Sequence, residues 1–235
     1  MEVKNSYKLI EDKSGHVQDS IIESFIGGRP KLPPTTNVPV CKLCGSQLTF
    51  FFQITFPIEH EWGGFTMSVF ACTSCFDERY LIPEMINGPL QGVNISDGFL
   101  KEYQKNFTIL VFKTAESSIV TNYVEKVRYS TIELIEFNQL TTRVDKIGGI
   151  PNWYLEDESP ATYNNNIPMM FIMQILEDRK FEILEGVPGQ VQMDYFSGKL
   201  EPSKKRYYEL FLANNLYFFG TRDRLNPLVY VLTQI

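Results

Sequence analysis

A stretch of this sequence that occurs twice at a constant spacing is the strongest constraint on its fold. The segment FIGGRP starts at Phe25 and matches KIGGIP, which starts at Lys146, while FFFQI starts at Phe50 and matches FIMQI, which starts at Phe171. In both cases the copies lie 121 positions apart, and at this offset eight residues in a 29-residue window are identical, where unrelated sequences would share roughly two. The sequence therefore predicts an internal duplication that produces two related units.

Each copy starts with a Gly-Gly-x-Pro turn, continues through a loop of about twenty residues, and enters an apolar strand that ends in Gln-Ile. Glycine supplies backbone angles that other residues disfavour, and proline restricts the next φ. Each repeated glutamine follows large apolar residues, so we expect it to be buried and to bond the backbone of the Gly-Gly turn, which is a structural role. The repeat residues are Gly27, Gly28, Pro30 and Gln53 in the first copy and Gly148, Gly149, Pro151 and Gln174 in the second.

All four cysteines of the chain lie in the first copy, as two Cys-x-x-Cys pairs. Two intervening residues let both sulfurs of a tight turn face one ion, and two such turns complete the tetrahedral thiolate site that is usual for structural zinc. In the second copy Thr162 and Asn165 stand where the first pair would be. We therefore predict a Zn²⁺ ion in the first unit only, with the ligands Cys41, Cys44, Cys72 and Cys75.

The residues between the two cysteine pairs predict two strands, 48–56 and 65–71, which would form a hairpin joined at its open end by zinc. Four thiolates leave no coordination position for water, so the predicted site is structural rather than catalytic. Two alternatives remain open at this point. Glu59 or His60 in the connection could replace a ligand, or a cysteine pair could act as a redox dithiol.

Further segments rich in strand-forming residues are 108–113, 216–220 and 228–232, whereas 117–137 mixes β-branched and charged residues and is a candidate helix. The predicted fold class is α+β and strand-rich, with two antiparallel β units side by side in one compact body. The predicted organisation is an N-terminal arm at 1–24, a first unit at 25–140 with the zinc site, and a second unit at 141–235 without cysteines.

Composition excludes some classes of function. The formal net charge is −6, which gives no overall positive field for general nucleic-acid binding. The basic cluster at 199–206 is short and reads as a solvated loop. No stretch approaches the roughly 18 apolar residues of a membrane span, and the first residues have no signal-peptide core. We therefore expect a cytoplasmic protein without membrane association.

The order of these motifs resembles two protein families. The first half, from the Gly-Gly-x-Pro turn at Gly27 through both cysteine pairs, resembles the N-terminal part of the programmed-cell-death-2 family. That resemblance implies zinc binding and chaperoning of a small-subunit ribosomal protein. The second half, from Ile147-Gly-Gly-x-Pro151-x-Trp153 to Val229-Tyr-Val-Leu-Thr-Gln234, looks like the bacterial YwqG-like family, whose occurrence beside toxin genes implies an immunity role for some members. Long acidic insertions and cysteines in the second half are missing here, so the chain departs from the chaperone family.

Residue patterns for catalysis are sparse in this chain. It has no phosphate-binding glycine loop and no Gly-x-Ser-x-Gly elbow, and it has only two histidines. Exposed aromatic and charged side chains on a rigid platform would instead suit protein binding. We select the loop that replaces the first cysteine pair and its flank as a possible recognition surface, with the residues Trp153, Tyr154, Glu156, Asp157, Glu158 and Tyr163.

The sequence thus predicts a non-enzymatic, protein-binding protein with structural zinc. The leading interpretation is an immunity or antitoxin-type protein that binds and blocks a toxin. The alternative is a chaperone-like binder of a ribosomal or other nascent protein, and an enzyme with an unrecognised site comes third.

Overall fold

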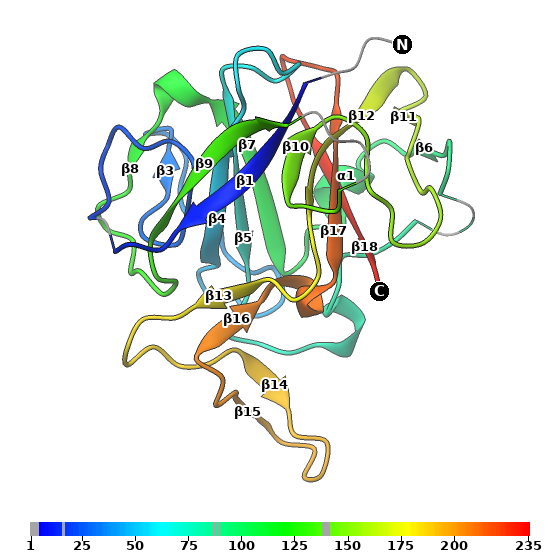
Figure 1. The fold of residues 1–235 in the computed structure, drawn as a ribbon. Coiled ribbons are helices and arrows are strands. Elements are labelled where there is room, and N and C mark those ends of the chain that lie inside the picture. Colours follow the sequence, from blue (N-terminus) through cyan, green and yellow to red (C-terminus); the bar gives the residue numbers. More distant parts are fainter. Residues whose placement is uncertain (1–4, 16, 87, 89, 138–141) are drawn as a thin grey trace.

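One large mixed sheet dominates the structure. The computed structural model describes residues 5–15, 17–86, 88, 90–137 and 142–235. Ten strands follow the order β18-β17-β12-β10-β1-β9-β2-β4-β5-β7, and β11 and β6 extend the sheet to 12 strands (Figure 1). The bounds are β1 (Ser6–Asp12), β2 (Phe25–Ile26), β4 (Thr49–Thr55), β5 (Phe65–Ala71), β6 (Asn94–Ile95), β7 (Phe107–Lys113), β9 (Ser130–Phe137), β10 (Lys146–Gly148), β11 (Thr162–Tyr163), β12 (Ile167–Ile175), β17 (Asn215–Thr221) and β18 (Val229–Gln234).

The predicted α+β class is wrong, because the described chain is mostly β. Its helical residues are confined to α1 (Phe99–Glu102) and to short 3₁₀ turns at Glu78–Tyr80, Thr114–Glu116 and Leu210–Ala213. The candidate helix at 117–137 instead contains β8 (Ser118–Ile119) and β9. β9 is flanked by β1 on one side and by β2 on the other, so hydrogen bonds to distant strands override its ambiguous local composition.

Each copy of the repeat is preceded by a strand that pairs with the other copy, and we call this the exchange of β1 and β9. β1 precedes the first copy in sequence, yet it pairs with β10 of the second copy; β9 precedes the second copy and pairs with β2 of the first. β1 and β9 also pair with each other along their whole length, from Ser6 opposite Phe137 to Asp12 opposite Thr131. Residues 6–12 of the expected N-terminal arm therefore form a strand at the centre of the sheet (Figure 1).

Outside this central pair, the two sides of the sheet have corresponding strand orders. β2, β4, β5 and β7 follow one another on one side, as β10, β12, β17 and β18 do on the other. The pairing shifts register between Phe50 and Phe52 in β4, and between Phe171 and Met173 in β12. These irregularities lie 121 positions apart. Corresponding local geometry is what the predicted duplication would produce, while the common origin of the halves stays a prediction.

Three small two-stranded sheets lie outside the large one. β3 (Lys31–Leu32) pairs with β8, and β13 (Lys180–Glu182) pairs with β16 (Tyr207–Glu209). β14 (Val191–Met193) and β15 (Leu200–Pro202) form a ribbon that projects away from the body of the molecule beyond β13 and β16 (Figure 1). This ribbon belongs to the stretch in which the two copies diverge.

The hydrophobic core is shared by both halves. Phe52 of β4 packs edge-on against Phe218 of β17, with their ring centroids 6.3 Å apart. Trp62 in the β4–β5 connection is fully buried, and its indole N–H donates to the carbonyl of Thr221 at 3.0 Å. The halves therefore form one packed body. None of the helices in the described residues has the length and hydropathy needed to cross a membrane.

Candidate metal centre

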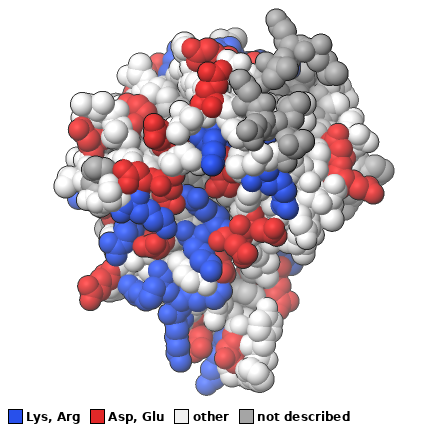
Figure 2. Space-filling view, viewed as in Figure 1, with Lys and Arg blue, Asp and Glu red and all other residues white. Residues whose placement is uncertain are grey.

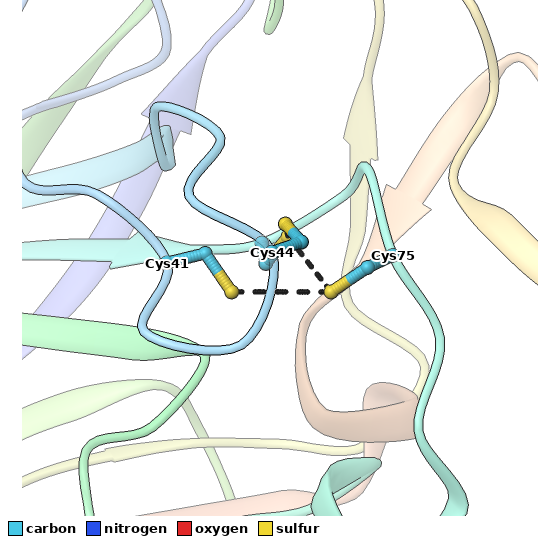
Figure 3. A group of neighbouring side chains, drawn as sticks. Cys41, Cys44 and Cys75 are labelled. Carbon is cyan, nitrogen blue, oxygen red and sulfur yellow. Dashed lines mark hydrogen bonds between the residues drawn. The ribbon is translucent and has the colours of Figure 1, made fainter.

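Four cysteine thiols meet at the open end of the β4–β5 hairpin. Cys41 and Cys44 precede β4, and Cys72 and Cys75 follow β5, so the antiparallel pairing of these strands brings both turns to the same end. The Cys41, Cys44 and Cys75 side chains converge in Figure 3. All four sulfurs lie within 4.8 Å of one another, and all four cysteines are free of disulfides.

The first cysteine turn is held by its own backbone. Cys41 N–H donates to the carbonyl of Ser46 at 2.8 Å, and Gly45 N–H donates to the carbonyl of Cys41 at 2.9 Å. Gly45 has a φ of 73°, in the left-handed region that side-chain-bearing residues disfavour. This glycine turns the chain sharply enough for both sulfurs to face the same point.

The second cysteine turn is held by neighbouring segments. Cys72 N–H donates to the carbonyl of Asn106, which directly precedes β7, at 2.7 Å. Ser74 N–H points at the sulfur of Cys72 at 3.4 Å, and the carbonyl of Thr73 accepts a hydrogen bond from Val191 at 3.0 Å. The turn therefore connects the hairpin, β7 and the base of the projecting ribbon. These backbone contacts join residues far apart in sequence, and no local motif signals them.

The spacing of the sulfurs fits tetrahedral coordination of one ion. A zinc–sulfur bond of 2.3 Å in a regular tetrahedron places neighbouring sulfurs about 3.8 Å apart. The sulfurs of Cys41 and Cys75 are 3.9 Å apart, those of Cys44 and Cys72 are 3.7 Å apart, and those of Cys72 and Cys75 are 3.4 Å apart. These four side chains can hold a metal ion without rearrangement of the fold.

The electrostatics of the cluster favour a cation at its centre. Burial raises the pKa of the Cys72 thiol to about 11, and burial together with neighbouring Cys72 also raises that of Cys75. Burial opposes ionisation of Cys44 as well, but hydrogen bonds from Ser46 outweigh it and lower its pKa to about 6. A bound cation would stabilise all four thiolates, since it replaces their mutual repulsion by attraction.

A lysine lies beside the thiols. Lys126 donates to the hydroxyl of Thr49 at 3.4 Å, and Thr49 shares a hydrogen bond with Thr73 in the second turn. Burial lowers the pKa of Lys126, while the charge of Cys72 acts in the opposite direction. A tetrathiolate around a divalent ion carries a net charge of about −2, so a nearby ammonium group is favourable.

The alternative ligands Glu59 and His60 lie at the other end of the hairpin. His60 stacks on Phe56 with ring centroids 4.8 Å apart, and its Nδ1 accepts from Trp62 N–H. Glu59 accepts from the Tyr7 hydroxyl. A seven-residue strand spans about 20 Å, so neither residue reaches the thiols. Among the residues described, the four cysteines form the only group of three or more Cys, His, Asp or Glu side chains placed to hold one ion.

The eight repeat residues form two equivalent turns. Gln53 accepts from Lys31 N–H and donates to the carbonyl of Glu23; Gln174 accepts from Asn152 N–H and donates to the carbonyl of Val144. Both glutamines are fully buried, and their bonds go to residues near the turn. The four glycines all have positive φ: Gly27, Gly28, Gly148 and Gly149. Pro30 and Pro151 directly precede the residues whose N–H groups bond the glutamines.

The six residues proposed for recognition have different environments. Tyr154, Glu156 and Asp157 are exposed, whereas Trp153 is partly buried against Tyr217, with ring centroids 4.5 Å apart. Tyr163 is buried; its hydroxyl donates to Asp97 and accepts from Gly98 N–H, so its ring is covered. Glu158 accepts from the side chain of Gln234 at 2.7 Å.

The buried side chain of Gln234 organises the exposed part of that loop. Its Oε1 accepts from the N–H groups of Tyr154 at 3.2 Å and Leu155 at 3.0 Å, and its Nε2 donates to the carbonyl of Glu156 at 2.9 Å. Gln234 is the penultimate residue of the sequence, and its role here depends on the position of β18, which sequence alone does not reveal.

No protein-family model matches this chain, and no curated protein matches it. The resemblance to the programmed-cell-death-2 and YwqG-like families therefore stays a prediction.

Proposed function

We propose that this chain is a non-enzymatic protein-binding protein with a structural zinc ion, and that it acts as an immunity-type protein that blocks a basic toxin. The observation that carries this proposal is the surface loop 154–157. Its four residues are exposed, and its backbone is fixed by Gln234 and by the Tyr217 hydroxyl. A preorganised loop loses little conformational entropy on binding, which favours its use as a recognition surface.

The side chains of this loop suit a basic partner. Tyr154 and Leu155 have exposed fractions of 45% and 61%, and the acidic Glu156 and Asp157 follow them. The loop thus offers apolar contact area next to negative charge, on a protein whose formal net charge is −6. Charge complementarity of this kind accelerates association and selects the partner more than it increases affinity.

The zinc ion would stabilise the scaffold rather than act in chemistry. Four thiolates fill its coordination shell, and Cys41 and Cys72 are packed in a buried cluster with Phe50 and Phe70. Loss of the ion would leave the buried thiols of Cys41 and Cys72 and the half-buried thiol of Cys75 without a counter-charge. We therefore expect Cys72→Ser to lose the metal and to open the hairpin end locally, as measured by bound zinc and by amide exchange.

The test is affinity purification from the native host with the wild type, Leu155→Asp/Glu156→Lys, and the control Glu84→Lys. Glu84 is exposed and lies outside the loop. We expect one stoichiometric basic protein with the wild type and the control, and at least tenfold less with the loop variant. A partner that is toxic when expressed alone and harmless when co-expressed supports immunity. A ribosomal protein would instead support the chaperone function. Equal recovery with all three baits would contradict a role for the loop.

A further inference from the structure

The projecting ribbon of β14 and β15 has one apolar face that the rest of the described molecule covers only in part. Val191 lies opposite Pro202, and Met193 lies opposite Leu200, so all four side chains are on the same face of the ribbon. None of them is buried, and Leu200 has an exposed fraction of 56%. An isolated two-stranded ribbon is at best marginally stable in water, so this face is suited to being covered by another chain.

The tip of the ribbon is ordered and aromatic. Asp194 Oδ1 accepts from the N–H groups of Phe196 at 3.0 Å and Ser197 at 2.7 Å, and Gly198 closes the turn with a φ of 66°. Tyr195 and Phe196 are directed into solvent, with exposed fractions of 86% and 103%. Two adjacent aromatic rings on a turn that is fixed by its own hydrogen bonds are typical of binding hot spots.

The base of the ribbon is attached firmly to the body. Val191 N–H donates to the carbonyl of Thr73 in the second cysteine turn, and the side chain of Gln190 accepts from Glu209 N–H at 3.1 Å. These contacts with the second cysteine turn and with β16 therefore fix the direction in which the ribbon projects. A fixed direction reduces the entropy cost of docking.

The ribbon also has free backbone groups along its edges. Ser203 N–H donates to the carbonyl of Gln190, and Asp194 N–H donates to the carbonyl of Lys199. Hydrogen-bonded and non-hydrogen-bonded pairs alternate along an antiparallel ladder, so Met193 and Leu200 form a non-hydrogen-bonded pair. The backbone N–H and C=O groups of these two residues therefore point outward from the ribbon. In the described structure these groups face away from any strand. A protein strand that adds to such an edge gains backbone hydrogen bonds as well as apolar contacts.

Positive charge surrounds this apolar face. Lys199 directly precedes the second strand, Lys204, Lys205 and Arg206 follow it, and Glu201 is the one acidic residue within this stretch. Lys205 pairs with Glu209 at 2.9 Å, but Lys199 and Lys204 form no ion pair with a described residue. Lys and Arg side chains gather over this part of the molecule in Figure 2.

We propose that the ribbon of β14 and β15 is a docking arm for a protein partner that presents an extended, apolar segment carrying acidic residues. The apolar ribbon face and the aromatic tip would bind the apolar side chains of that segment, and Lys199 and Lys204 would attract its acidic residues. This site is separate from the acidic loop 154–157 and has the opposite charge preference, so it goes beyond the function proposed above.

Two other occupants fit the arm less well. Insertion into a membrane would place the outward backbone groups of Met193 and Leu200 in hydrocarbon, where an unpaired polar group costs several kcal/mol. Pairing of two copies of this chain through their ribbons would bring like-charged lysines together, which opposes association. An acidic protein segment satisfies both the backbone and the charges.

The experiment is a selection of random twelve-residue peptides on full-length, metal-loaded protein, with counter-selection on a variant that has a shorter ribbon. In this variant the dipeptide Asn-Gly replaces residues 193–200. It forms a two-residue turn that connects the hydrogen-bonded pair of Gln192 and Glu201. The hydrogen bond from Val191 to Thr73 is kept. The replaced residues include no buried side chain, and the variant should retain its metal and its melting temperature.

We expect the enriched peptides to alternate apolar and acidic residues. Their binding should weaken at least tenfold with Tyr195→Ala/Phe196→Ala and with Lys199→Glu/Lys204→Glu, and should weaken as salt increases. Leu225→Ala, at an equally exposed site elsewhere, should have no effect. Binding should also be unchanged in Glu156→Lys, so failure of the loop proposal and failure of the arm proposal are distinguishable.

Two results would overturn the proposal. One is the absence of any peptide that distinguishes the wild type from the shortened variant. The other is co-sedimentation with phosphatidylserine vesicles that requires Tyr195 and Phe196 and has a higher affinity than any selected peptide. That result would assign the tip to a membrane surface. The aromatic variants test this even if the shortened ribbon fails to fold, because both rings are fully in solvent.

Discussion

At the scale of single residues, the two buried glutamines show how a polar side chain can specify a turn. Each occupies a core position at the end of a strand, and each bonds one backbone N–H and one backbone carbonyl near its Gly-Gly-x-Pro turn. The bonded partners of Gln53 and Gln174 are themselves 121 positions apart. A buried amide that is satisfied in this way favours one backbone arrangement over others, because any alternative leaves polar groups unpaired.

Replacing either glutamine with leucine should therefore destabilise the protein. Gln53→Leu leaves Lys31 N–H without its acceptor, and Gln174→Leu does the same to Asn152 N–H. We expect each change to lower the free energy of unfolding by roughly 1–3 kcal/mol, the cost of one buried unsatisfied group. Urea unfolding of the metal-loaded protein measures this. Gln192→Leu, on the exposed ribbon, is the control, and losses no larger than that of the control would contradict the role.

A buried lysine makes stability depend on pH. Lys146 of β10 is only 2% exposed and donates to Asn152, and burial lowers its pKa to about 8. Between this value and the ordinary pKa of about 10.4, the unfolded chain binds more protons than the folded one, so stability rises with pH. We expect the wild type to gain of the order of 1–2 kcal/mol between pH 8 and pH 9.5 relative to Lys146→Met.

The comparison of the two proteins isolates this lysine, because other titrating groups are common to both. Unfolding by urea at several pH values gives the difference. Lys101→Met, at an exposed position, should follow the wild type across the same range. A constant difference between the wild type and Lys146→Met would show that the ammonium group stays charged in the folded protein.

At the scale of elements, the second cysteine turn joins the hairpin of β4 and β5 to β7 and to the base of the ribbon. The hairpin of β4 and β5 ends at the thiols, β7 bonds Cys72 through Asn106, and β14 bonds Thr73. These contacts all converge on the second cysteine turn. An ion bound by the four thiols would hold this turn further.

Removing the metal with a chelator should therefore loosen the ribbon as well as the cysteine turns. We expect amide exchange at Cys72 and Val191 to accelerate at least tenfold, because their acceptors lie in or beside the turn. Amides of β12, such as Met173, should remain protected, since that strand lies between β10 and β17. Hydrogen exchange with mass spectrometry resolves these regions. Equal acceleration throughout the chain would mean that the ion supports global stability, and no acceleration at Val191 would separate the ribbon from the metal.

At the scale of the whole molecule, the exchange of β1 and β9 joins the halves. Each of these strands pairs with the first strand of the other half, and the two pair with each other over seven residue positions. If the chain is divided before β9, neither part contains all the strands that complete its own side of the sheet. Cutting the sheet between the halves would expose long unpaired edges, which are prone to aggregate.

We expect fragments 1–125 and 126–235, which place β1 and β9 in different pieces, to be unfolded or aggregated when expressed alone and to form a folded complex when co-expressed. Dispersion of amide signals in NMR spectra and a cooperative thermal transition measure folding. The intact chain is the control. A stable fold in either isolated fragment would show that the halves are independent domains and that the exchanged strands contribute little to their stability.

Much of the local structure follows from the sequence alone. The Cys-x-x-Cys spacing predicts two tight turns that face one ion, and the four sulfurs do lie within 4.8 Å of one another. The apolar segments 48–56 and 65–71 correspond to β4 and β5. Burial of the two glutamines follows from their place after large apolar residues. All of these features depend on residues close together in the chain, where spacing and side-chain type limit the conformation.

The tertiary structure alone decided the fold class, the exchange of β1 and β9, and the exposure of each candidate surface. A strand is stabilised by partners that can be more than 100 positions away, as β1 and β9 are, so the composition of 117–137 did not reveal a central strand. Tyr163 is covered and Phe196 is fully exposed for a similar reason: packing depends on which distant segments meet. Local residue type determined the turns and the cysteine cluster, while non-local pairing determined the order of the strands in the sheet and which side chains reach solvent.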